Sequence, residues 1–133
     1  MRRVFADTQY FLALLNKVDE HHLRAAQFTA AYDGKMYTTD WVLTELADGL
    51  SAARTRLICS NFIQDQRNDP DVFTVPAERA LFNKALKLYA DRPDKDWSLT
   101  DCISFIAMQE SGIADALTAD HHFEQAGFRA LLK

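Results

Sequence analysis

The chain has 133 residues, of which 48% are apolar and 26% are charged. This composition excludes a disordered chain and predicts a single globular domain over residues 1–133. The net charge of −4 disfavours a protein that coats nucleic acid non-specifically through a basic surface. The first residues contain too few apolar side chains for a signal peptide, and no apolar run approaches ~20 residues, so we expect a cytoplasmic protein with no membrane association. Cys59 and Cys102 lie among apolar neighbours, and we expect both thiols to be reduced.

Short apolar segments alternate with helical patterns along the chain. The first half predicts a strand at Arg3–Ala6, the start of a helix at Tyr10–Leu15, a helix at Asp19–Ala31, a strand at Lys35–Thr38 and a helix that Asp40 caps and that runs through Leu50. The second half predicts a helix at Ala53–Gln66, a strand at Val72–Val75, a helix opened by Pro76, a helix from Ser98 to about Ser111, a strand at Ala116–Ala119 and an edge strand at Phe128–Leu132. This order indicates an α/β fold, a three-layer α/β/α sandwich with a central parallel sheet.

Four acidic residues lie where ligands bind in such sheets, beyond the carboxyl ends of the strands. Asp7 and Asp120 directly follow two of the strands, Glu45 lies in the second turn of its helix, and Asp101 lies in the first turn of another. Each has a structural alternative: Asp7 is also placed to cap the next helix, and Asp101 follows Ser98 by three residues, as in a capping box.

Two patterns favour a functional role for these acids. The helix after Asp101 is apolar nearly all round, and Glu45 has Trp41, Val42 and Gly49 one turn away and no basic residue there. Burying a carboxylate without a partner costs several kcal/mol. A cation bound from outside the chain would therefore stabilise the carboxylates of both Asp101 and Glu45.

Oxygen ligands without cysteine or histidine select Mg²⁺ or Mn²⁺, which activate water for attack on phosphorus. Hydroxyl side chains suited to orient the ligands are Thr8, Ser98, Thr100 and Ser104. The pair His21 and His22 lacks zinc-site spacing, and His121 and His122 are expected in a solvated turn, with a substrate contact left open. The arginines expected to meet phosphates are Arg2, Arg3, Arg54, Arg56 and Arg67.

Three segments together resemble a known family. Val-Phe-Ala-Asp-Thr at the start, Thr-Thr-Asp-Trp-Val-Leu-Thr-Glu in the middle, and the long block from Ser98 to Phe128 are similar to PIN-domain nucleases of the VapC toxin type. The resemblance covers the whole chain and implies a PIN-like fold. It also implies that Asp7, Glu45, Asp101 and Asp120 bind Mg²⁺ or Mn²⁺ and cleave RNA, usually in a homodimer that an antitoxin inhibits.

We therefore expect a metal-dependent endoribonuclease, the toxin of a type II toxin-antitoxin system. One alternative is a non-catalytic module of the same fold that binds RNA or protein and holds a structural ion. A receiver-like phosphoacceptor domain is disfavoured, because Thr8 and Gln9 stand where a second acid is needed and no lysine lies near Asp120.

Overall fold

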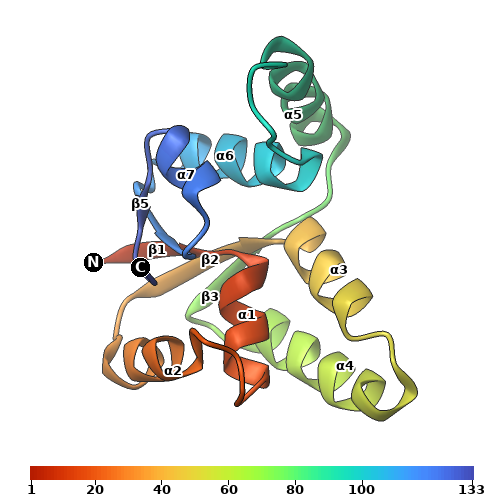
Figure 1. Cartoon of the computed structure of the whole chain (residues 1–133), viewed down its shortest axis with the longest axis vertical. Helices are drawn as coiled ribbons and strands as arrows, with labels where there is room; N and C mark the ends of the chain where they lie inside the picture. The colour runs from red at the N-terminus through yellow and green to blue at the C-terminus, as the bar shows by residue number, and fades with distance from the viewer.

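A five-stranded parallel sheet, in the order β3-β2-β1-β4-β5, forms the centre of the computed structural model, which describes residues 1–133 (Figure 1). Its strands are β1 (Arg3–Ala6), β2 (Lys35–Thr39), β3 (Val72–Val75), β4 (Asp115–Leu117) and β5 (Arg129–Ala130). β1 pairs with β2 on one side and with β4 on the other. The chain thus builds one half of the sheet first and then returns to the other side of β1.

Helices cover both faces of this sheet. They are α1 (Thr8–Leu15), α2 (His22–Ala31), α3 (Asp40–Gly49), α4 (Ala53–Asn68), α5 (Arg79–Asp91), α6 (Leu99–Ser111) and α7 (His121–Gln125). Figure 1 shows α1, α2 and α4 on one face and α6 and α7 on the other, with α5 packed outside α6. The predicted three-layer α/β/α sandwich is confirmed. No helix combines the length and the apolar character that crossing a bilayer requires.

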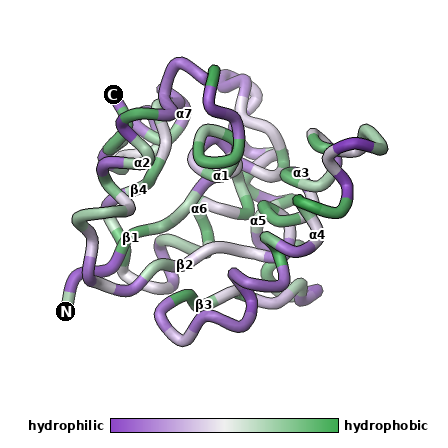
Figure 2. Tube along the Cα trace, turned by 90° about the horizontal axis from the view of Figure 1, so that it is seen from below, coloured by the Kyte–Doolittle hydropathy of each residue, from purple (hydrophilic) through white to green (hydrophobic).

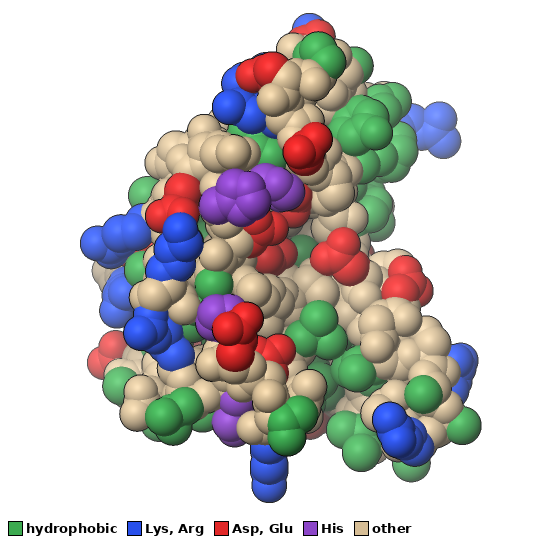
Figure 3. Space-filling view, viewed as in Figure 1, with side chains coloured by type: hydrophobic (Ala, Val, Ile, Leu, Met, Phe, Trp, Pro, Cys, Tyr) green, Lys and Arg blue, Asp and Glu red, His purple; other side chains and the backbone are tan.

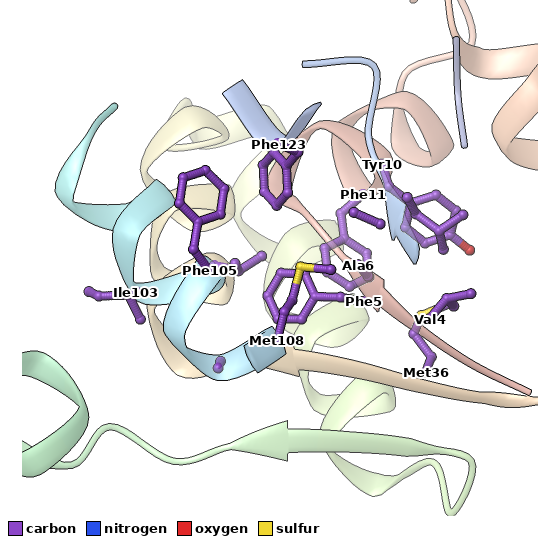
Figure 4. Close-up of a cluster of buried hydrophobic side chains, with 14 of the residues drawn as sticks. Val4, Phe5, Ala6, Tyr10, Phe11, Met36, Ile103, Phe105, Met108 and Phe123 are labelled. Atoms are coloured by element: carbon purple, nitrogen blue, oxygen red, sulfur yellow. The ribbon is translucent and has the colours of Figure 1, made fainter. Parts of the chain in front are cut away.

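Aromatic side chains from several elements fill the core (Figure 4). Phe5 of β1 and Phe11 of α1 are almost completely buried, and Phe105 of α6 packs edge-on against Phe123 of α7 with ring centroids 5.0 Å apart. Figure 2 shows the same partition along the trace, with hydrophobic residues in β1 and hydrophilic ones in the outer turns. The Phe105–Phe123 contact holds α6 against α7.

The ends of several elements differ from those predicted. Thr39 rather than Asp40 caps α3, because the Thr39 hydroxyl accepts from the Val42 amide while Asp40 bonds to the Ala77 amide. α1 begins at Thr8, α2 at His22 and α5 at Arg79, and β5 is only two residues long. α7 was not predicted, because five residues with a single buried side chain are too few to show helical periodicity.

Removal of the Phe105 ring should destabilise the protein. The ring is 1% exposed and lies against Trp97, Phe123 and Phe128, so Phe105→Ala is expected to lower the free energy of unfolding by roughly 3–5 kcal/mol. Urea denaturation measures this loss. The control is Phe73→Ala, at a ring 54% exposed, where a loss below about 1 kcal/mol is expected; equal losses would contradict the assigned core.

Candidate active site

The candidate site lies where the chain, after adding β2 and β3 on one side of β1, begins to add strands on the other side. β1 and β4 are neighbours in space, with Ala6 opposite Leu117, although the chain visits β2 and β3 between them. Asp7 follows β1, and Thr118 follows β4 in the same register. Such a switch point leaves a crevice beyond the carboxyl ends of the two strands, which is the usual ligand site of an open parallel sheet.

Asp7 is buried at this switch point without a cationic partner. Asp7 is 7% exposed, and its Oδ2 accepts a hydrogen bond from the Thr118 hydroxyl at 2.9 Å. Although Asp7 precedes α1, its side chain caps no amide of that helix, so the capping alternative is wrong. Burial, with a smaller contribution from the negative charges of Asp101 and Glu45, raises the pKa of Asp7 to about 7, although the hydrogen bond from Thr118 acts to lower it.

Asp101 is held at the start of α6 by a complete capping box. The Ser98 hydroxyl accepts from the Asp101 amide at 3.0 Å, and Asp101 Oδ2 accepts from the Ser98 amide at 3.2 Å. The capping role therefore coexists with a place in the site. The side chain is 14% exposed, and burial raises its pKa, as does the charge of Asp120. The expected partial desolvation of Asp101 is confirmed.

Glu45 reaches the site from α3. Its carboxylate accepts a hydrogen bond from the hydroxyl of Thr8, the first residue of α1. The residue is exposed, so the expectation that an apolar surrounding would desolvate it is wrong. The helix turns its apolar side, with Val42 and Leu46, into the core and leaves Glu45 at the edge.

Asp120 and the histidines after it form the fourth corner. Asp120 caps α7, with its Oδ1 accepting from the His122 amide at 2.9 Å. His122 Nδ1 lies 3.1 Å from Asp101 Oδ2 and 3.5 Å from Asp120 Oδ1. The solvated turn expected here is wrong for His122, whose side chain is 20% exposed and lies between two site acids.

Thr118 and Gln9 are two further residues beside Asp7 that were not predicted as part of the site. The Thr118 hydroxyl is completely buried between Asp7 Oδ2 and Gln9 Oε1, and the Ala119 amide donates to the same Gln9 oxygen at 2.6 Å. The only available signal for Thr118 was its position two residues before Asp120. No periodic pattern marks Gln9.

The four predicted acids thus converge on one region, since Asp7 feels the charges of Asp101 and Glu45, and Asp101 feels that of Asp120. Figure 3 shows acidic side chains gathered beside histidines in the middle of one face. A group of carboxylate oxygens with no ion pair to lysine or arginine suits a hard divalent cation. Ser104, one helical turn after Asp101, is buried with an unpartnered hydroxyl, which also leaves a polar group for water or an ion shell.

The five arginines expected to meet phosphates lie in two different parts of the structure. Arg2 and Arg3 stand at the amino end of β1, at the sheet edge opposite the acids. Arg2 lies over the Phe28 and Tyr32 rings, and Arg3 donates to the Ser111 carbonyl at 2.6 Å. This position is distant from the acids, and a phosphate contact by either arginine stays a prediction. The remaining three, Arg54, Arg56 and Arg67, are exposed on α4.

Comparison with known proteins identifies the same fold. The PIN domain family pattern matches residues 4–129. The crystal structure of VapC20 of Mycobacterium tuberculosis, described as a sarcin-ricin loop cleaving toxin, is 26% identical with a TM-score of 0.85 and covers 94% of this chain and 95% of its own. FitAcB of Neisseria gonorrhoeae, 14% identical with a TM-score of 0.67 over 96% of this chain and 94% of its own, supports the fold alone. Curated protein sequences gave no match.

The raised pKa of Asp7 predicts a pH-dependent stability. Between the ordinary value of 3.8 and about 7, the folded chain keeps the Asp7 proton and the unfolded chain releases it, so stability falls as pH rises, by at most ~1.4 kcal/mol per unit. Asp7→Asn should remove this slope and be more stable than the wild type at pH 8, with a smaller difference at pH 5.

Urea denaturation in chelator measures both curves. Asp65→Asn, at an exposed residue of α4, is the control and should keep the wild-type slope. Parallel curves for wild type and Asp7→Asn between pH 5 and 8 would show that Asp7 does not titrate abnormally.

Proposed function

This chain belongs to the PIN domain family, and from that membership we propose that it is a Mg²⁺- or Mn²⁺-dependent endoribonuclease, the toxin of a type II toxin-antitoxin system in the cytoplasm. The observation that carries the proposal is the burial of Asp7 beside other acids with no cation of the chain to pair with it. Keeping such a group lowers stability, which a purely structural role does not explain. The similarity to a toxin that cleaves the sarcin-ricin loop supports RNA as the substrate.

The side chains divide the work in this proposal. Asp7 and Asp101 would hold the ion directly, with Glu45 and Asp120 completing its shell as ligands or through water. A bound Mg²⁺ or Mn²⁺ supplies Lewis-acid activation of water and neutralises charge that develops on the phosphate.

Hydroxyl groups orient these acids. Thr118 donates to Asp7 and thereby fixes the direction of its free oxygen, and Thr8 does the same for Glu45. Ser104, whose hydroxyl is buried and unpartnered, is placed to bond to Asp101 or to a water beside it. Glu45, the most exposed of the acids, is suited to take a proton from water, because its carboxylate borders solvent.

Loss of the charge of Asp7 or of Asp101 should strongly reduce cleavage. Asp7→Asn and Asp101→Asn keep the side-chain shape but remove a charged ligand, so RNA cleavage in Mn²⁺ is expected to fall by at least about 100-fold, and excess chelator should stop the wild type. Asp65→Asn on the exposed side of α4 should cleave normally. Gel analysis of labelled RNA measures the rates.

Two results of that assay would reject the nuclease. Full-rate cleavage by Asp7→Asn or in chelator would show that the acids do not hold a required ion. RNA that is retarded on a gel but never shortened would instead favour the binding module.

A groove between α3 and α4 is the proposed antitoxin site. It has a volume of about 730 Å³, and its lining includes Leu50, Leu57 and Ile63, with Arg56 and Arg67 among its polar residues. Leu57 is 72% exposed, so its side chain offers apolar surface to a partner. An amphipathic antitoxin segment with acidic residues would complement both the apolar floor and the arginines.

Leu57→Asp should weaken antitoxin binding by at least ~10-fold, because it places a charge on the apolar surface. Calorimetry with an amphipathic acidic peptide, the kind of segment proposed for the antitoxin, measures the affinity. Leu23→Asp, on α2 at a residue 68% exposed, is the matched control and should bind normally. Equal affinities of both variants would place the partner elsewhere.

We also propose a homodimer, for which light scattering should give about twice the chain mass of 15.1 kDa.

A further inference from the structure

Two imidazole rings meet carboxylates at the start of α7. One potential ligand atom from each of Asp120, His121 and His122 lies within 4.8 Å of the others. Asp120 Oδ1 is 3.6 Å from His121 Nδ1 and 3.5 Å from His122 Nδ1, and Asp101 Oδ2 adds a second oxygen 3.1 Å from His122 Nδ1. Nitrogen and oxygen donors from two helices are therefore gathered at one point.

The separations match those of ligands around a transition-metal ion. Ligand atoms about 2.1 Å from an ion are about 3.0 Å apart at octahedral angles and about 3.4 Å apart at tetrahedral angles. The three measured contacts, 3.1, 3.5 and 3.6 Å, fall close to this range. An ion could thus be bound here with small side-chain movements rather than a rearrangement of the helices.

Backbone hydrogen bonds already hold the two oxygen donors. Asp120 Oδ1 accepts from the His122 amide, and Asp101 Oδ2 accepts from the Ser98 amide. His122 is 20% exposed and is further confined by the His121 ring, with centroids 4.4 Å apart. Such fixed donors lose little conformational freedom when they bind an ion, which strengthens binding.

We propose that Asp120, His121 and His122, together with Asp101, bind a transition-metal ion such as Co²⁺ or Zn²⁺ at the edge of the acidic site. Imidazole nitrogen favours these ions over Mg²⁺, which prefers oxygen. The inference deepens the proposed function and rests on it for the use of the ion, because Asp101 belongs to both ligand groups. Binding itself is measured without RNA.

The chain supplies its own comparison, a second pair of adjacent histidines. His21 and His22 lie at the start of α2, where His22 Nδ1 is 2.7 Å from the Ala13 carbonyl and His21 Nε2 is 3.5 Å from Glu20. This pair faces one exposed carboxylate and a backbone oxygen, and it forms no cluster of three ligands. It should not bind the ion.

The test compares Co²⁺ and Mg²⁺ binding by the full chain after removal of metal with chelator. His121→Asn and His122→Asn should each weaken Co²⁺ binding by at least ~10-fold in calorimetry and alter the visible Co²⁺ absorption, while Mg²⁺ affinity changes by less than about twofold. His121 is 65% exposed, so its replacement leaves the core intact. His21→Asn is the matched control and should bind Co²⁺ like the wild type.

Unchanged Co²⁺ affinity and absorption in both α7 variants would overturn the proposal. A parallel loss of Mg²⁺ affinity would also overturn it, because the variants would then have damaged the carboxylates rather than removed nitrogen ligands. Failure of the proposed function gives a different result. RNA would stay intact, although Co²⁺ would still bind and its binding would depend on His121 and His122.

Discussion

The parallel pairing of β1 with β4 brings Asp7 next to Thr118, which is 111 positions away in the sequence. The pairing also determines the environment of Asp7, because the central strand of a covered sheet ends inside the molecule. The carboxylate is left with one hydroxyl donor and no basic partner, and other acids lie near it. The electrostatics of the site follow from this placement.

A buried acid of this kind is unfavourable for the fold, and the core must offset it. The aromatic contacts of Phe105 with Trp97 and Phe123 join α6 to the segments on either side of it. They thereby hold Asp101 opposite Asp120 despite their mutual repulsion. Apolar packing thus maintains an arrangement of charges that protonation or a cation relieves.

The site and the proposed antitoxin groove share α3. Glu45 reaches the acidic site from this helix, while Ala47 and Leu50 of the same segment line the groove toward α4. A partner bound in the groove would therefore contact the helix that positions one of the acids. His122 of α7 contacts a different acid, Asp101. In the two proposals, binding of a partner and selection of the ion therefore involve different ends of one site.

The sequence by itself determined the alternation of strands and helices and the bounds of β1 and β3, since local periodicity is written in neighbouring residues, and it singled out the four acids as candidates for a site. Only the tertiary structure decided that Asp7 bonds to Thr118 rather than capping α1, that Glu45 is exposed, and that His122 lies between two acids. Those outcomes depend on contacts between segments far apart in the chain, and no local pattern encodes which hydroxyl, amide or ring will stand opposite a given side chain after packing.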